Sequence, residues 1–409
     1  MKTDSLSLLA GIVLLATSFQ VWGRDVTVSG VVRDKSSNKI IDRVSLIVNG
    51  TDIGTVSNDE GYFSLTFPDS LLAKGIRAEQ IGYKTHSLSG GQLTSGPVIF
   101  RLQPNPKMLE DVVVYGADPK ALVETAIRKI PQNYSVVPNL FSSFYRETIQ
   151  KGKRYIGVSE GIVDVFKKSY KHRNIMGDRV RLRKGRRQVS QRNSDTIAVK
   201  ILGGPNIPVL LDFVKNEELL FGLADLDNYN FKMEPMAMLD DRRQFVVSFS
   251  PKVKMDYPLH KGKLYIDQET TSFTKAEYSL DVSDKEKATR AILYKKPRGL
   301  HFKPQDVDFV VTYKFQDGVS YLNYISARTR FKCDWKRRLF SSGYTAFSEM
   351  VMVDREECPA TAISAREAFR DKDIFYDMVD DFSDPDFWKD YNIIEPTESL
   401  EKAVAKLKN

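Results

Sequence analysis

The stretch from Val26 to Leu102 most narrowly limits what this chain can fold into. Short runs of β-branched and aromatic residues alternate there with turns such as Asn49-Gly50 and Asn58–Gly61. In the run Val44–Asn49, side chains alternate between the two faces of a strand, so Val44, Leu46 and Val48 would share one face. Such alternation marks strands with one buried face, and regularly spaced turns mark antiparallel hairpins. Residues 24–105 are therefore predicted to form an antiparallel β-sandwich.

The same stretch resembles the carboxypeptidase regulatory-like domain, a transthyretin-like (prealbumin-like) β-sandwich found beside carboxypeptidases. The residues that carry the resemblance are Gly30, Asp34, Val44, Gly50-Thr51, Gly54-Thr55, Asn58–Phe63 and Ile81–Tyr83. The resemblance implies a fold more readily than a reaction, because this domain is usually an accessory module.

Residues 1–23 have the pattern of a secretory signal peptide. Lys2 supplies a positive start, and the apolar run Leu6–Thr17 is too short to span a bilayer. Val21–Gly23 suits a cleavage site, so Arg24 is the predicted first residue of the mature chain. A retained N-terminal anchor helix is the alternative. No later apolar run is long enough for a membrane helix, and we expect an exported protein of the periplasm or outer membrane.

The length of the chain points to several domains. Removing the signal from 409 residues leaves roughly 386, enough for two or three domains. The two cysteines, Cys333 and Cys358, are an even, low number that suits an exported protein. Pairing them would stabilise the fold by about 3 kcal/mol. A hairpin that turns near residues 341–343 would instead place Cys358 well past the residue opposite Cys333. From the sequence, a disulfide between these cysteines and two separate thiols are therefore both possible.

Residues 106–117 are predicted to be a linker with a short strand, because Pro104 and Pro106 cannot continue a sheet. Asp118-Pro119 then predicts the start of a helix that Pro131 ends. Residues 118–358 are predicted to form an antiparallel sheet domain with covering helices. Residues 188–240 are the exception, since Leu210–Leu223 has helical spacing and predicts a loop with one or two helices. The expected strands are 140–150, 155–166, 179–183, 244–249, 263–267, 273–282, 307–315, 321–331 and 344–353.

The central region resembles two groups of exported proteins. Phe144–Glu147, Tyr155–Gly161 and the ending Phe387–Pro396 are similar to uncharacterised exported proteins of the Bacteroidetes type, which carry the same front sandwich. Gly262–Asp267 with Phe273–Glu277 also looks like the half-barrel of lipoprotein-carrier proteins. That likeness implies a sheet curled over a helix to form an apolar groove.

One motif could indicate an enzyme. Gly157-Val-Ser159-Glu-Gly161 matches the nucleophile elbow of serine hydrolases, which needs a strand that turns sharply into a helix at the serine. The residues after Gly161 instead continue a strand, so we favour a bend or bulge in one long strand. Ser36–Lys39 matches a Ser-x-x-Lys pattern by its letters alone and falls in a predicted turn.

Metal chemistry has little support in the sequence. A catalytic zinc needs clustered His and carboxylate ligands, and no two of the four histidines lie within one helical turn. These are His86, His172, His260 and His301. Asp225–Asn230 and Asp381–Asp386 lack the spacing of a calcium loop and are interpreted as solvated turns. The sequence therefore predicts no catalytic residue, cofactor site or metal site.

Two blocks of opposite charge stand out. Residues 167–192 hold eleven Lys or Arg against one acid, and residues 371–401 hold eleven Asp or Glu against two Lys. Export argues against nucleic acid as the partner of the basic block. The basic block could be a solvated strand edge or a site for anionic lipid headgroups. A third option is that the acidic, aromatic C-terminal segment, residues 359–409, docks on the basic block.

The fold class expected from the sequence is mainly β with some α: a sandwich followed by a half-barrel-like sheet with covering helices. The predicted function is that of a non-catalytic binding or interaction module of the cell envelope. Its curled sheet would hold an apolar or lipid ligand, or contact another envelope protein. The alternatives are an envelope hydrolase that uses Ser159 or an unrecognised acid pair, and a purely structural protein without a cavity.

Overall fold

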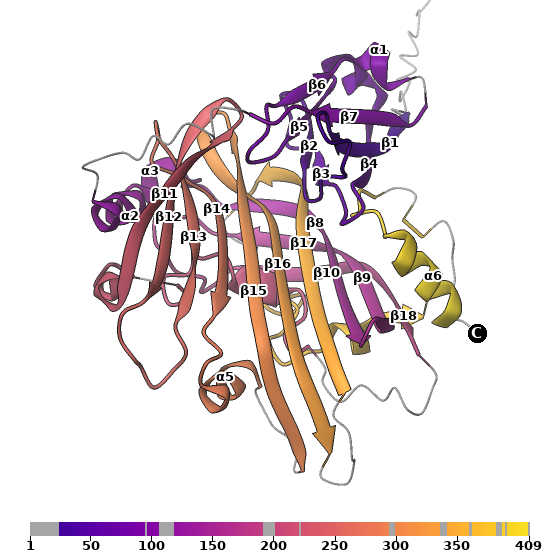
Figure 1. The fold of residues 1–409 in the computed structure, drawn as a ribbon. Coiled ribbons are helices and arrows are strands. Elements are labelled where there is room, and N and C mark those ends of the chain that lie inside the picture. The colour runs from indigo at the N-terminus through magenta and orange to yellow at the C-terminus, as the bar shows by residue number, and fades with distance from the viewer. Residues whose placement is uncertain are drawn as a thin grey trace, which may run out of the picture.

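The computed structural model describes residues 24–94, 96–105, 118–190, 201–220, 222–293, 299–335, 342–359, 362–381, 387–388 and 391–407. The predicted signal peptide (1–23) and linker (106–117) lie outside these residues. The N-terminal part forms two small sheets with strand orders β4-β1-β7 and β3-β2-β5-β6 (Figure 1). The elements are β1 (Asp25–Asp34), β2 (Ser45–Val48), β3 (Gly54–Val56), β4 (Tyr62–Pro68), η1 (Asp69–Lys74), β5 (Ile76–Glu79), β6 (His86–Leu88), α1 (Gly90–Leu93) and β7 (Val98–Leu102).

The core of this sandwich confirms the alternation predicted for β2. Val44, Leu46 and Val48 are fully buried, together with every second residue of β4. The side chain of Ser45 points the other way and accepts a hydrogen bond of 2.8 Å from Asn323 of the central domain. One side of β2 therefore builds the sandwich, and the other side meets the rest of the molecule.

The central domain is one large curved sheet. Ten antiparallel strands follow the order β11-β12-β13-β14-β15-β16-β17-β8-β9-β10, β18 joins the β10 edge in parallel, and the sheet does not close into a barrel. The predicted fold class is thereby confirmed. The strands are β8 (Asn139–Lys151), β9 (Arg154–Lys167), β10 (Arg179–Val189), β11 (Tyr229–Leu239), β12 (Arg242–Pro251), β13 (His260–Asp267), β14 (Phe273–Leu280), β15 (Leu300–Gln316), β16 (Val319–Trp335), β17 (Ser342–Glu357) and β18 (Asp380–Asp381).

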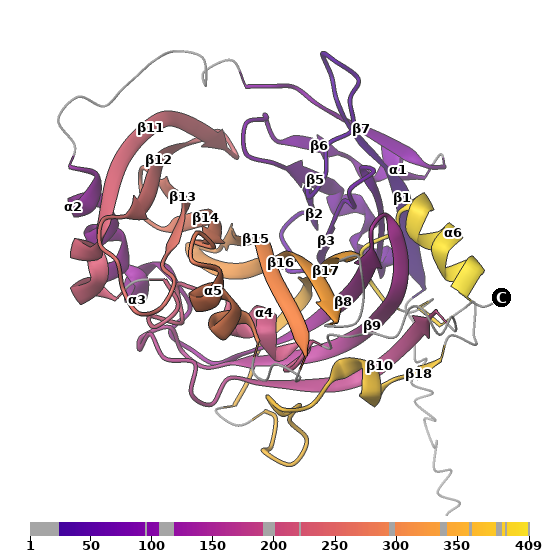
Figure 2. The ribbon, with the colours of Figure 1, turned by 60° about the horizontal axis from the view of Figure 1, so that its bottom comes forward.

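Short helices occupy the inner face of this sheet (Figure 2). The predicted helix after Asp118 is confirmed as α2 (Pro119–Arg128), capped by the Asp118 carboxylate and followed by α3 (Ile130–Asn133). The other helical elements are α4 (Asn206–Leu210), η4 (Leu223–Asn228), α5 (Lys285–Ile292), η5 (Phe375–Met378) and α6 (Glu398–Leu407). No helix within the described residues is both long and apolar enough to cross a lipid bilayer.

The prediction for residues 188–240 was partly wrong. Residues 211–220 form turns instead of a helix, and residues 229–239 form strand β11. The apolar spacing of Leu210–Leu223 is real, and its buried members pack against the sheet and against Tyr278 and Tyr313. These buried residues are Leu211, Phe213, Val214 and Leu220, whereas Leu223 is 41% exposed. Tertiary burial here produced a helix-like pattern without a helix.

The sandwich packs on the opposite face of the large sheet. Asp52 of the sandwich forms ion pairs with Lys314 at 3.3 Å and Arg355 at 2.9 Å, and all three side chains are nearly buried. Val56 joins Phe144, Tyr324 and Val351 of the sheet in one apolar cluster. Charged and apolar contacts together therefore fix the sandwich to the sheet.

The C-terminal segment docks on the basic strand β10, as the third option for the charge blocks predicted. Arg187 donates to the carbonyl of Tyr376 at 2.7 Å, and the Arg186 guanidinium lies 4.8 Å from the Trp388 ring. Phe375 packs on the inner face of the sheet, whereas Trp388 packs on the outer face. The segment thus wraps the edge of the sheet, and β18 pairs with that edge.

Docking of this segment depends on the absence of a side chain at Gly185. A Cβ atom there would lie 2.4 Å from Cγ1 of Val379, which is closer than real contacts allow. We expect Gly185→Ala to push Val379 and β18 off the edge and to cost about 1–3 kcal/mol of unfolding free energy. Limited proteolysis measures the release of β18, and urea unfolding measures the loss of unfolding free energy. Gly343→Ala is the control, because nothing lies within 4 Å of its Cβ position; equal behaviour of both variants would contradict the expectation.

The two cysteines are too far apart to pair with each other. Cys333 on β16 lies opposite Ser342, where β17 begins, and Cys358 follows the last residue of β17. Sixteen residues of strand separate Ser342 from Cys358, which is about 50 Å at roughly 3.3 Å per residue. The position of Cys358 well past the residue opposite Cys333 is confirmed, and the alternative of a disulfide between the two is excluded by distance.

Candidate functional site

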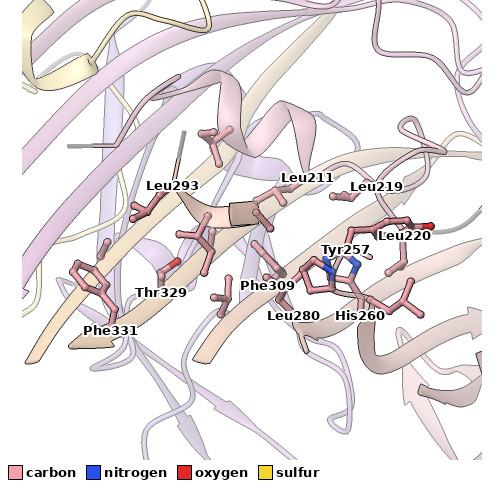
Figure 3. Close-up of a pocket in the computed structure, with 18 of the residues that line it drawn as sticks. Leu211, Leu219, Leu220, Tyr257, His260, Leu280, Leu293, Phe309, Thr329 and Phe331 are labelled. Atoms are coloured by element: carbon pink, nitrogen blue, oxygen red, sulfur yellow. The ribbon is translucent and has the colours of Figure 1, made fainter. Parts of the chain in front are cut away.

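The inner face of the sheet forms the floor of an apolar pocket of about 730 Å³ (Figure 3). Because strand side chains alternate, every second residue of β16 lines it, namely Ala327, Thr329 and Phe331. The cationic residues between them, Arg328 and Arg330, belong to the other face. The remaining floor residues come from β14, β15 and β17: Leu280, Leu300, Phe302, Val307, Phe309, Ala346 and Ser348.

Several segments outside the floor strands wall the pocket. Leu211, Leu219 and Leu220 come from the turns after α4, and Ile292 and Leu293 come from the end of α5. The loop before β13 adds Tyr257–Leu259. Lys287 of α5 donates to the carbonyl of Met255 at 2.7 Å, which ties α5 to that loop. The walls are therefore held to one another as well as to the sheet.

The pocket exists because small side chains occupy the middle of its floor. Ala327 lies opposite both Phe309 and Ser348 in the strand register, and Ala346 lies close by on β17. Farther along the same face, Tyr134, Phe213 and Tyr313 fill the space with edge-on ring contacts. The concave face is therefore part packed core and part open pocket, which differs from a sheet filled entirely by its own side chains.

A buried polar network holds the wall beside Leu211. The Asp212 carboxylate accepts hydrogen bonds from Tyr170 at 2.6 Å and Tyr313 at 2.7 Å, and it pairs with Lys167 at 2.9 Å. Burial by itself would raise the pKa of Asp212, but Lys167 and the two hydroxyls lower it overall. The carboxylate therefore stays charged and anchors the turn from the sheet side.

Polar groups gather at one end of the pocket. Tyr257 and His260 lie there beside Leu219 and Leu220, whereas Leu293 and Phe331 lie at the other end (Figure 3). Glu218, which directly precedes Leu219, also lines the pocket, as do Asp225 and Asn228 of η4, which follows the same turn. The His260 ring packs edge-on against Tyr278 at 5.5 Å and near Phe309 at 6.1 Å. Burial lowers the pKa of His260 to about 4, so its imidazole is neutral at pH 7.

The neutral state of His260 predicts a pH-dependent stability. The pKa falls from 6.5 in the unfolded chain to about 4 in the fold, so the unfolded chain binds more protons between these values. We expect this residue to cost the fold up to roughly 3 kcal/mol as the pH drops from 6.5 to 4. Urea unfolding of the wild type and His260→Gln at pH 7 and pH 4.5 isolates the effect. An unchanged difference between the two proteins at both pH values would contradict it.

The structure does not support the nucleophile elbow. Ser159 is 2% exposed and lies in the middle of β9, opposite Glu147 on β8 and Arg187 on β10. No strand-to-helix turn occurs there, so the geometry that the motif requires is absent at this position. Ser36 lies in the turn after β1, where its N–H donates to Asp34 at 2.7 Å.

The histidines and the predicted acidic turns are dispersed. His86, His260 and His301 lie on three different strands, and His172 lies in the loop after β9. Among the residues that the structure describes, no three His, Cys, Asp or Glu side chains are grouped for a metal ion. The side chain of Asp225 caps η4, and Asp227 pairs with Lys120 at 2.5 Å. Residues 382–386 lie outside the described chain.

Buried carboxylates do occur, but in the packed part of the molecule. Burial raises the pKa of Glu147 to about 8, and Tyr145 donates to this carboxyl at 2.9 Å. Glu147 and Asp212 do not line the pocket. Three pocket residues, Asp225, Asn228 and His260, were considered from the sequence, but only as possible metal ligands. The floor residues were not singled out, although the Ala-Arg-Thr-Arg-Phe-Lys alternation of residues 327–332 shows the two faces of β16.

The front domain is of the carboxypeptidase regulatory-like class. Residues 28–114 match the family model described as a CarboxypepD_reg-like domain, which confirms the resemblance predicted from sequence. The matched family is thus the regulatory domain, and the match covers the sandwich and the start of the linker.

One curated relative matches about a quarter of the chain. TonB-dependent receptor P3 of Formosa agariphila is 29% identical over 103 residues, which is 25% of this chain and 10% of that receptor. The chain therefore corresponds to about a tenth of the length of this relative.

Two solved structures resemble the fold loosely. A DUF1329 family protein from Desulfovibrio piger is 11% identical with a TM-score of 0.26, over 61% of this chain and 96% of that one. A domain described as an outer membrane lipoprotein-sorting protein domain, from Vibrio parahaemolyticus, is 12% identical with a TM-score of 0.24, over 60% of this chain and 94% of that one. Likenesses this loose say nothing about ligand or activity.

Proposed function

We propose that this chain is an exported, non-catalytic protein of the cell envelope that holds an apolar or lipid ligand in the pocket on its curled sheet. The observation that carries the proposal is the pocket itself. A cavity of about 730 Å³ with mainly aliphatic and aromatic walls and a few polar groups at one end matches sites for small apolar molecules, which span about 300–1,000 Å³.

The construction of the pocket favours binding over catalysis. Its histidine is neutral and packs against aromatic rings, and Ser159 lies in a buried strand position. The walls are tied together through α5 and through the Asp212 network. A pre-formed apolar cavity of this kind binds by excluding water, and it does not require a nucleophile.

The accessory sandwich suits an envelope location. Residues 28–114 match a regulatory-like domain, and a curated relative of part of the chain is a TonB-dependent receptor. We place this protein in the periplasm or at the outer membrane, where it would carry or sense its ligand and contact another envelope protein through the sandwich.

The test is to purify residues 24–409 from periplasmic and membrane fractions under native conditions and to identify bound small molecules by mass spectrometry. A stoichiometric lipid or other apolar molecule is the expected result. If neither fraction yields a bound molecule, the carrier role is wrong and contacts with proteins become the better account of the fold.

A further inference from the structure

The pocket is asymmetric along its length. Figure 3 shows Phe331 and Leu293 at one end, and Leu219, Leu220, Tyr257 and His260 at the other. The first end is apolar apart from the Thr329 hydroxyl, whereas the second adds carboxylate, amide, hydroxyl and imidazole groups. A molecule with a hydrocarbon chain and a polar head would therefore enter in one orientation, because the chain gains free energy only at the apolar end.

Local structure places two carboxylates at the polar end. Glu218 directly precedes the wall residues Leu219 and Leu220. Asp225 accepts a hydrogen bond of 3.1 Å from the N–H of Gly222, which holds η4 next to the same turn. The Tyr229 hydroxyl donates to the carbonyl of Leu220 at 3.4 Å and joins the two segments. Both carboxylates line the pocket.

The charge at this end is one-sided. Among the described residues that line the pocket, Glu218 and Asp225 are the charged groups at neutral pH, and none is a lysine or arginine. His260 adds no positive charge, since it is buried against Tyr278 and Phe309. The polar end therefore presents mainly hydrogen-bond acceptors and negative charge.

From this geometry we infer that the pocket selects amphiphiles with a cationic amino head over amphiphiles with an anionic head. The inference rests on the proposed function and adds the class of ligand. A protonated amine offers three donors to an acceptor-rich end, whereas a carboxylate head would meet two like charges. Because Glu218 is exposed and Asp225 is half-buried, solvent weakens both effects. We expect an amine to bind about tenfold more tightly than the matching carboxylate.

Three ligands with the same chain test this: dodecylamine, dodecanol and dodecanoate at pH 7. Each displaces the neutral fluorophore N-phenyl-1-naphthylamine from the full mature chain, and the affinity order should be amine, alcohol, carboxylate. In the double variant Glu218→Gln/Asp225→Asn, the preference for the amine should disappear while dodecanol binding stays unchanged. Asparagine keeps an oxygen acceptor for the Gly222 N–H. Glu218→Gln alone, at an exposed position, should remove part of the preference if the double variant does not fold.

The control is Glu269→Gln, an exposed carboxylate in the turn after β13, which should leave all three affinities unchanged. If none of the three ligands binds the wild type, the proposed function itself fails. If all three bind equally, or dodecanoate binds best, the pocket stands and the head-group inference is overturned. An amine preference that survives the double variant also overturns the assignment to these two carboxylates.

Discussion

Ala327→Trp is expected to abolish apolar-ligand binding while the protein still folds. Ala327 lies at the middle of the pocket floor, opposite Phe309 on β15 and Ser348 on β17. An indole at this position would fill the space that the small floor residues leave open. Because the cavity is already present, the added ring needs little movement of the core, in contrast to insertion into a packed interior. Affinity for a neutral apolar fluorophore should fall by more than about tenfold.

The matched control for this variant is Lys332→Trp. Lys332 is an exposed residue of the same strand, on the face turned away from the pocket, so the same ring is added without entering the cavity. Thermal unfolding and circular dichroism of both variants establish that the fold is retained. Full binding by Ala327→Trp would show that the ligand site lies elsewhere.

Glu160→Gln is expected to cause the largest loss of stability, about 3–5 kcal/mol, because it removes the carboxylate that two cations share in a buried site. Arg146 keeps only its second ion pair, with Glu349 at 3.3 Å. Glu160 accepts from Arg146 at 2.8 Å, from Arg186 at 3.2 Å and from the Trp388 indole at 3.2 Å. The Arg146 and Glu160 side chains are each 4% exposed. A glutamine has the same shape but directs an amide donor or a neutral oxygen at these donors. Urea unfolding at pH 7 measures the loss.

The pH dependence of that loss has a definite sign. Burial by itself would raise the pKa of Glu160. Arg146 and Arg186 lower this pKa by more than burial raises it, so the pKa in the fold lies below the unfolded value of 4.5. A carboxyl with a depressed pKa contributes its stability above 4.5 and loses it as the pH falls through the folded value. The difference between wild type and Glu160→Gln should therefore be largest above pH 4.5 and shrink in acid.

The control for Glu160→Gln is Glu124→Gln, which removes an exposed ion pair with Arg128 on α2. Exposed pairs contribute about 0–1 kcal/mol, so this variant should unfold nearly as the wild type does. If both variants lose the same small amount, the Arg146–Glu160 cluster does not hold the C-terminal segment as described. Because Glu160 also accepts a hydrogen bond from Trp388, limited proteolysis of the C-terminal segment is a second measurement of the loss.

Local patterns in the sequence predicted most of the fold. Strands β8 and β9 begin and end within a residue of the predicted ranges, because each is a run rich in β-branched and aromatic residues and the tight turn Lys151–Lys153 separates them. The start of α2 follows from the cap formed by Asp118 and Pro119. Strand β11 was missed, since eight of its eleven residues are exposed or half-buried and its apolar residues do not alternate cleanly.

The two charge blocks offered docking of the C-terminal segment on β10 as one of three options, and the tertiary structure decided for it. The sequence by itself determined the regulatory-like sandwich, the antiparallel character of the central domain and the helix after Asp118. Each of these depends on neighbours in the chain. Only the tertiary structure decided the pocket, because its walls meet from segments as distant as Leu211, Leu293 and Phe331. It also decided where the concave face is filled and where it is open. The inner face is filled where a large ring such as Tyr313 points inward, and it is open where a small residue such as Ala327 does. The sizes of residues that meet only in space decide this, and the periodicity of one strand does not encode them.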